Sequence, residues 1–377
     1  MIKRLYFLSM IFFGALGAQI YPGAAFSVMS SDNIFKGPDP VFDYMYLVSV
    51  SLDYLPEKSG FSFFYNGDFD FYRTYNDRNS SYHGLGLNYF SKIGRDKKNN
   101  FYLGTDFQMR INDEVYEVYD YSQFYLYGNF KFNFEALTLK TGYNFRFRNY
   151  TNYTDLSHSR HIFFVQLART FQTKTTLKIE ADFGYKKYAN SEVYKPGTGT
   201  GGRSRPGYTV VESNPLTNFV IMGRAAQSII DDVGLSAYYR QQFSLSKEGQ
   251  TFNSDITNQD SELFDDPFSY ESVEYGTTLK IILPWRINLD LNYGRAEKNY
   301  ITENAYFSDV DSIGLGGLRE DDYQNFSVSI DKSFLLEASW LYSLNIYFDF
   351  HLLDNASNSY WYNYREKFYQ VGVSFNF

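Results

Sequence analysis

Cysteine is absent from this chain of 377 residues. Its absence excludes disulfides, thiolate metal sites and thiol nucleophiles, and also lipid attachment at an amino-terminal cysteine. Positive charge is scarce too, because 43 acidic residues outnumber 35 basic ones and leave a formal net charge of −8. So acidic a balance argues against nucleic acid as a partner. The fold must therefore be stabilised by non-covalent contacts alone.

Long hydrophobic runs are missing beyond the amino terminus. A membrane-spanning helix needs about 18 or more apolar residues in a row, and no stretch of the later sequence reaches that length. A helical membrane protein is therefore excluded.

The amino terminus has the layout of a secretory signal peptide. Lys3 and Arg4 precede an apolar run, Leu5 to Leu16, which ends in small residues. The run is short for a single transmembrane anchor, the alternative interpretation. We predict that residues 1–18 are removed on export and that residues 19–377 form one domain.

Aromatic residues are abundant. The chain has 37 Tyr, 37 Phe and 3 Trp, which make up 20% of its residues, yet its mean hydropathy is −0.40. Strands with one apolar face reconcile these values, because only every second residue of such a strand must be apolar. Aromatic rings also gather where such strands meet the two surfaces of a membrane. A secreted β-sandwich or β-solenoid alternates as well and stays open as an alternative.

Apolar and polar residues alternate along nearly the whole mature chain, in segments of about 10 to 15 residues bounded by Gly, Asn, Asp, Lys or Pro. None of the segments has the 3.6-residue period of an amphipathic helix. Fifteen segments predict strands, near residues 43–54, 61–73, 82–93, 101–112, 122–134, 137–149, 160–171, 175–188, 216–228, 233–246, 271–283, 285–299, 322–334, 339–353 and 362–377.

The connections between these segments alternate between short and long. Short ones such as Glu135–Ala136 lie between long ones such as Ala189–Pro215 and Lys247–Tyr270. Short turns on one side of a membrane and long loops on the other are typical of transmembrane β-barrels. The rhythm therefore orients the chain, and its last strand runs inward.

The same rhythm requires one more strand near the amino terminus. The segment at 43–54 leads into a short turn, so an earlier strand must bring the chain to the opposite side. Gly23–Ser31 fits that role, followed by an external loop at Asp32–Phe42. We therefore predict an all-β fold, a single transmembrane antiparallel up-and-down β-barrel of about 16 strands, with 14 as the alternative.

The last nine residues, 369–377, alternate without a break. Their polar face has no charge, and we expect this strand to close the barrel against Gly23–Ser31. Its apolar face comprises Tyr369, Val371, Val373, Phe375 and Phe377.

If the apolar faces meet lipid, nearly every charge in the middle of a strand points inward. A charge facing lipid at the midplane would cost about 2 to 4 kcal/mol. The early strands supply acidic residues and the later ones mainly basic residues, so a transverse field across an aqueous pore is one interpretation and ion pairing between neighbouring strands is the other. The predicted inward residues are Asp53, Asp68, Asp70, Asp106, Arg110, Lys131, Lys140, Arg146, Arg148, Lys178 and Lys186.

Three other features suggest chemistry, but each has a simpler explanation. The glycines of 195–207 lack the Gly-Lys-Ser/Thr ending of a phosphate-binding loop, and the acidic loop 253–266 lacks EF-hand spacing. Ser159 and His161 share one face of a predicted strand, but no oxyanion hole accompanies them. We predict no catalytic residues, no metal and no cofactor.

The signal peptide, the alternation, the rhythm of connections and the terminal Phe377 together resemble the bacterial outer-membrane β-barrels, and more loosely their porin-like members. The resemblance implies a place in the outer membrane, with lipid and lipopolysaccharide around the barrel, and recognition of the terminal strand by the barrel assembly machinery. It further implies passive or weakly selective diffusion of small hydrophilic solutes. A structural or adhesive barrel with a closed lumen and a hydrolase at the rim are the alternatives.

Overall fold

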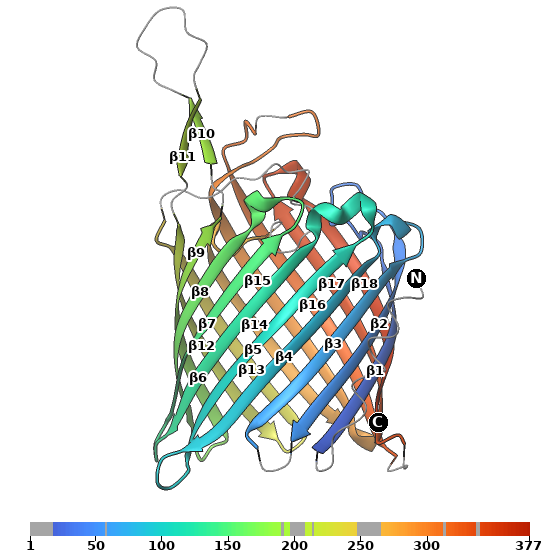
Figure 1. Ribbon diagram of the computed structural model, residues 1–377, viewed down its shortest axis with the longest axis vertical. Coiled ribbons are helices and arrows are strands. Elements are labelled where there is room, and N and C mark those ends of the chain that lie inside the picture. The colour runs from blue at the N-terminus through green and yellow to red at the C-terminus, as the bar shows by residue number, and fades with distance from the viewer. Residues whose placement is uncertain are drawn as a thin grey trace, which may run out of the picture.

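The computed structural model describes residues 18–56, 59–189, 192–196, 208–212, 215–246, 265–311, 314–336 and 340–377. Sixteen of its strands form one closed antiparallel barrel (Figure 1), which confirms the predicted fold and strand count. Among the described residues, no helix is long and apolar enough to cross a membrane. Apart from Ala18, the predicted signal peptide lies outside the described residues and stays a prediction.

Eight strands of the barrel run from the end with short turns, here the turn end, to the end with long loops, here the loop end. They are β1 (Ala18–Ser31), β3 (Phe61–Tyr72), β5 (Asn99–Asn112), β7 (Thr138–Tyr150), β9 (Thr175–Tyr188), β13 (Val233–Ser244), β15 (Ile287–Asn304) and β17 (Ser343–Ser357). The strands that return are β2 (Asp43–Pro56), β4 (Ser80–Ile93), β6 (Tyr121–Asn133), β8 (His158–Thr170), β12 (Leu216–Ile230), β14 (Tyr270–Leu283), β16 (Leu318–Leu335) and β18 (Tyr364–Asn376).

The barrel closes between its first and last strands. β1 pairs antiparallel with β18 in a register that runs from Gly23 opposite Asn376 to Ser31 opposite Phe368. This is the predicted seam. β1 starts at Ala18, five residues earlier than expected, and the added residues pair with β2 up to Pro56.

The connections keep the predicted alternation of short and long. The η5 turn, Pro284–Arg286, joins β14 to β15, and both Trp285 and Arg286 adopt positive φ there, at 63° and 58°. At the loop end, short 3-10 helices follow several strands: η2 (Asn76–Arg78), η3 (Glu114–Tyr119), η4 (Thr154–Leu156) and η6 (Tyr360–Tyr362).

Some bounds differ from the prediction at the loop end. β15 extends to Asn304 and β16 begins at Leu318, so their connection is shorter than the predicted 300–321. The longest loop also contains an unpredicted hairpin, β10 (Glu192–Pro196) with β11 (Tyr208–Glu212), which stands above the barrel in Figure 1. In the predicted loop 189–215, polar and basic residues outnumber apolar ones, so the sequence lacks the alternation that would predict these two strands.

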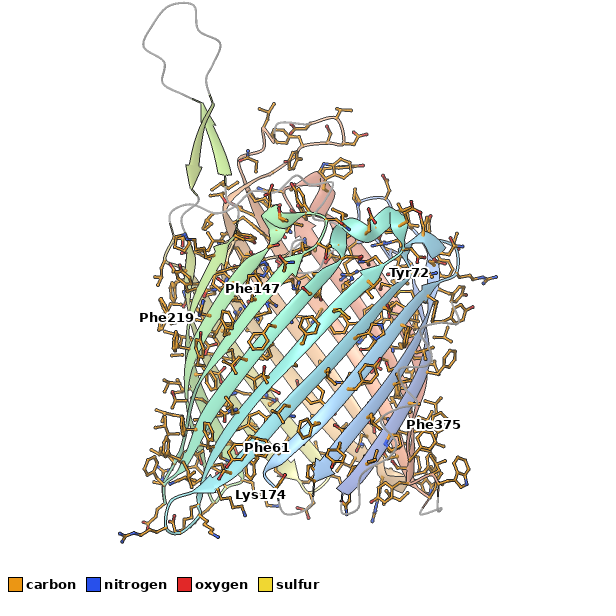
Figure 2. The ribbon with its side chains drawn as sticks, viewed as in Figure 1. Phe61, Tyr72, Phe147, Lys174, Phe219 and Phe375 are labelled. Atoms are coloured by element: carbon orange, nitrogen blue, oxygen red, sulfur yellow. The ribbon has the colours of Figure 1, made fainter. Side chains whose placement is uncertain are left out.

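Large apolar side chains cover the outer surface (Figure 2). Phe163 is 53% exposed and Ile179 is 61% exposed, whereas their neighbours in sequence on the inner face are less accessible. Trp340 and Tyr342, expected on a strand, precede β17 and are also exposed. The outer face is therefore suited to lipid, and the polar side chains face the lumen.

Candidate functional site

The predicted inward residues lie on the inner face of the wall. The acidic members are on β2 to β5, and two of them accept hydrogen bonds from hydroxyl groups: Ser49 Oγ donates to Asp68 Oδ1 at 2.6 Å, and Ser80 Oγ donates to Asp70 Oδ2 at 3.3 Å. Asp106 is 6% exposed, and its Oδ1 has no hydrogen-bond partner among the described residues. One side of the lumen thus carries negative charge.

Arg110 lies among the acidic members on β5, whereas the other basic members lie farther around the wall and several have local partners. Lys178 pairs with Glu180 at 3.2 Å on β9. Arg148 Nε donates to Gln123 Oε1 at 3.0 Å, and its guanidinium lies 4.1 Å from the Tyr121 ring centroid. Ion pairing along and between strands therefore accounts for part of the charge, as one of the two interpretations expected.

Near the mouth, three strands have a basic residue followed, after one intervening residue, by a tyrosine. The pairs are Arg148 with Tyr150 on β7, Lys186 with Tyr188 on β9, and Lys298 with Tyr300 on β15. All six side chains point inward and are buried; the three tyrosines are at most 2% exposed. The sequence repeat therefore places equivalent cation and phenol groups around the loop end.

The segment Asp265–Ser269, here the mouth segment, folds against this inner face. Asp266 Oδ2 accepts from Lys186 Nζ at 2.8 Å and from the Tyr188 hydroxyl at 3.0 Å. Asp265 pairs with Lys298 and accepts from the Tyr300 hydroxyl at 2.9 Å. Two adjacent carboxylates thus join β9 to β15, which are separated by three other strands.

Backbone and apolar contacts also fix the residues of the mouth segment that follow the two carboxylates. The Pro267 carbonyl accepts from Gln242 Nε2 at 2.5 Å. Phe268 is 3% exposed, packs on Tyr188 and Leu216, and lies over Gly184, where any Cβ would be 2.9 Å from its ring. The mouth segment therefore covers the inner wall across β9 to β15 at the loop end.

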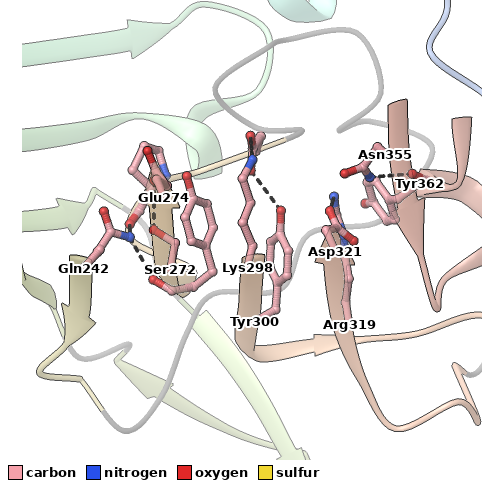
Figure 3. Close-up of polar contacts among 12 residues, drawn as sticks. Gln242, Ser272, Glu274, Lys298, Tyr300, Arg319, Asp321, Asn355 and Tyr362 are labelled. Carbon is pink, nitrogen blue, oxygen red and sulfur yellow. Dashed lines mark hydrogen bonds and ion pairs between the residues drawn. The ribbon is translucent and has the colours of Figure 1, made fainter. Parts of the chain in front are cut away.

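A buried arginine continues the charged ring next to Lys298 (Figure 3). Arg319 is 1% exposed, pairs with Asp321 at 2.5 Å and with Glu303 at 3.1 Å, and its guanidinium lies between the rings of Tyr300 and Tyr362, at 4.1 and 3.3 Å from their centroids. This cluster ties β15 and β16 to η6.

These contacts lower the pKa of one carboxyl group of the mouth segment. Burial acts to raise the pKa of Asp265, but Lys298, Arg319 and the Tyr300 hydroxyl outweigh it, and the pKa is lowered from its ordinary value of 3.8. Asp265 is therefore a carboxylate at neutral pH.

Comparison with known proteins bears on the fold. No protein-family model and no curated sequence matches the chain. OccK8 (OprE) of Pseudomonas aeruginosa is 10% identical, with 96% of this chain and 98% of that chain covered and a TM-score of 0.50. OccK5 (OpdH) of the same organism is 12% identical, with the same coverage and a TM-score of 0.50. The chain has the fold of a bacterial outer-membrane, porin-like β-barrel. In bacterial barrels of this fold, the short turns lie in the periplasm and the long loops lie outside the cell.

The sequence favours a solvated acidic loop at 253–266, and the structure corrects this for the end of that loop. Its last two acidic residues, Asp265 and Asp266, enter the mouth, while residues 247–264 lie outside the described part. The repeated pair of a basic residue and a tyrosine could have indicated these contacts from the sequence, because buried cations need acidic partners nearby. Of the glycine-rich stretch 195–207, only the first two residues are described.

The histidine cluster is divided between the two faces of the barrel wall. His158 is fully buried on the inner face, where Nδ1 lies 2.8 Å from the Leu156 carbonyl and Nε2 lies 3.3 Å from Arg146 Nη2. His161 faces outward, and its Nδ1 lies 2.7 Å from the Tyr143 hydroxyl. The hydrogen-bond contact of His161 with Tyr143 therefore lies on the outer face, apart from the contacts of His158 on the inner face.

Aromatic residues on the inner face lie against glycines of the neighbouring strand. Five such pairs face each other in register, and a Cβ on any of these glycines would be 2.2 to 2.7 Å from the aromatic ring. The pairs are Phe64 with Gly86, Tyr127 with Gly104, Phe164 with Gly142, Tyr238 with Gly276 and Tyr347 with Gly372. Because the rings lie along the wall, they occupy little of the bore. Sequence reasoning missed these pairs, since they depend on strand register.

Proposed function

We propose that the protein is an outer-membrane channel for passive or weakly selective diffusion of small hydrophilic solutes. The observation that supports this most is a barrel of 16 strands whose inner face is lined by carboxylates, amides and cations. A barrel of this size encloses more space than its own side chains fill. The rings laid against glycines keep that space free.

The mouth segment would act as the filter at the external entrance. Its carboxylates are paired with Lys186 and Lys298, so the ring of cations there is partly neutralised. The acidic residues on β2 to β5 and the basic residues farther around the wall remain as opposing groups below it. Solutes would then be sorted by size and by charge.

Solute flux into proteoliposomes tests the channel proposal. Swelling should be fast for small neutral solutes and should fall steeply as their size increases. Folded, inserted protein that gives no more swelling than protein-free liposomes would refute the proposal. A folded barrel is recognised by its resistance to SDS before heating.

The outer surface suits the partners proposed for the barrel. Lys187, Arg365 and Lys367 lie on the outer face near the loop end and are exposed, so they are placed to meet lipopolysaccharide phosphates. Lys186 and Lys298, on the inner face, are buried. The outward row from Tyr369 to Phe377 is available to the assembly machinery before the seam closes.

A surface-adhesive role is the second candidate, because the β10–β11 hairpin stands outside the barrel (Figure 1). Deleting residues 190–214 separates the two functions. The channel proposal predicts unchanged swelling of proteoliposomes, whereas an adhesin would lose its binding to surfaces.

A further inference from the structure

A hollow of about 470 Å³ lies in the inner wall between β5 and β9, below the mouth. It is within the range of about 300 to 1,000 Å³ that small-molecule sites occupy. Its lining is Tyr102, Tyr127, Asn129, Lys140, Asn144, Ile162, Phe164, Gln166, Glu180 and Asp182.

The strand register arranges this lining in adjacent rows. Tyr127 is paired with Asn144, and one row lower Gly142 is paired with Asn129 on one side and Phe164 on the other. Phe164 is in turn paired with Asp182 on β9. Aromatic rings and hydrogen-bonding groups therefore alternate over one continuous patch of wall.

Glycines shape the floor of the hollow. A Cβ on Gly142 would lie 2.7 Å from two atoms of the Phe164 ring, and one on Gly104 would lie 2.4 Å from Tyr127. Both rings therefore lie along the wall rather than across the bore, where they offer apolar surface to a solute. Lys140 Nζ is 5.5 Å from the centroid of the Phe164 ring.

The polar groups around the floor are both donors and acceptors. Asn129 and Asn144 each offer an amide oxygen and an amide nitrogen. Glu180 is already engaged, because it pairs with Lys178 and accepts from Gln166. Asp182 Oδ1, in contrast, is buried and has no hydrogen-bond partner among the described residues. A buried carboxylate oxygen without a donor calls for one from a ligand.

The charge of the lining selects among solute classes. Glu180 is compensated by Lys178, which leaves one lysine and one carboxylate, so the hollow has no excess positive charge that would favour an anionic solute. A neutral ring with hydroxyl groups fits better: its C–H face can pack on Phe164 and Tyr127, and its hydroxyls can donate to Asp182 and exchange hydrogen bonds with the amides.

We propose that this hollow is a binding subsite for neutral saccharides on their way through the lumen. The inference rests on the proposed channel and adds to it a solute class and a place on the wall. Phe164 supplies the stacking surface, and Asp182 accepts a hydrogen bond from a sugar hydroxyl.

Maltose added to a planar bilayer that contains single channels tests the subsite. Maltose should block the current reversibly, at lower concentrations than open-chain sorbitol or anionic benzoate. Phe164→Ala and Asp182→Asn should each raise the half-blocking concentration about tenfold or more, as the loss of one central contact does. Phe164→Tyr should preserve the block.

Tyr347→Ala is the matched control, because Tyr347 lies over Gly372 in the same way but outside the hollow. It should leave the half-blocking concentration within about twofold of the unmodified channel. The inference is overturned if maltose blocks no better than sorbitol, if benzoate blocks better than maltose, or if Tyr347→Ala weakens block as much as Phe164→Ala does. If no current flows at all, the channel proposal fails, and calorimetry with maltose and the detergent-solubilised barrel tests the subsite separately. Binding heat that is lost in Asp182→Asn would support the subsite, and the absence of any binding heat would refute it.

Discussion

Replacing Lys186 by methionine should release the mouth segment from the wall. Lys186 is fully buried, 2.8 Å from Asp266 Oδ2, and Asp266 is itself 5% exposed. Removing one partner of a buried ion pair leaves an uncompensated charge and typically costs about 3 to 5 kcal/mol. At about 1.4 kcal/mol per factor of ten, the undocked population of the segment should rise roughly 10² to 4 × 10³-fold.

The absence of cysteine makes this population measurable with one reporter. Ser269 is 9% exposed in the docked segment, and none of its described contacts uses its hydroxyl group. A thiol introduced by Ser269→Cys should react with maleimide only while the segment is undocked. Lys186→Met should then speed the labelling by about 100-fold or more, in line with that free-energy change.

Two further variants separate the ion pair from general damage. Lys178→Met removes a cation from the same strand whose pair with Glu180 does not involve the mouth segment, so labelling should change less than about fivefold. Combining Lys186→Met with Asp266→Leu removes both charges and should restore most of the protection. Labelling that is unchanged by Lys186→Met would refute the account of how the segment is held.

Three other predictions follow from the same contacts. Gly142→Ala should destabilise the barrel by about 1 to 3 kcal/mol in urea unfolding, because its methyl group would lie 2.4 Å from the Gly128 carbonyl oxygen and 2.7 Å from the Phe164 ring, whereas Gly223→Ala has open space around it and should be neutral; equal effects would contradict the close packing around Gly142. Arg319→Met should cost about 3 to 5 kcal/mol by leaving Asp321 and Glu303 without their cation, and an unchanged unfolding midpoint would argue against that cluster. The pKa of Asp265 is lowered from 3.8 because Lys298, Arg319 and Tyr300 together outweigh its burial. The ionised Asp265 therefore stabilises the docked segment fully above pH 3.8, and this stabilisation is lost as the pH falls through the pKa of the folded state. Labelling at position 269 by a dipyridyl disulfide should therefore stay slow from pH 7 to about 4 and rise only below it; a rise near pH 6 would contradict this order.

The strands and their order were predictable because a lipid-facing wall imposes a period of two over a fixed length. The pairing of the last strand, at Tyr369–Phe377, with the first, at Gly23–Ser31, could be predicted from the even number of strands alone, and the seam confirms it. Strand bounds at the loop end were not predictable to the same degree. β15 continues past Tyr300 to Asn304, where lipid no longer requires alternation.

The inward position of the charges also followed from alternation, but their partners did not. Lys186 and Asp266 are 80 residues apart in sequence, and only the folded loop brings them together. The pairing of Phe164 with Gly142 depends on strand register, which sequence fixes only after the turns are known. Contacts between distant segments therefore had to come from the structure.

Single-channel recording in a planar lipid bilayer reports whether the lumen is continuous. The purified, folded protein should give stepwise conductance, with larger steps after Lys186→Met releases the mouth segment. Folded and inserted barrels that carry no current at any voltage, with or without that substitution, would contradict this prediction.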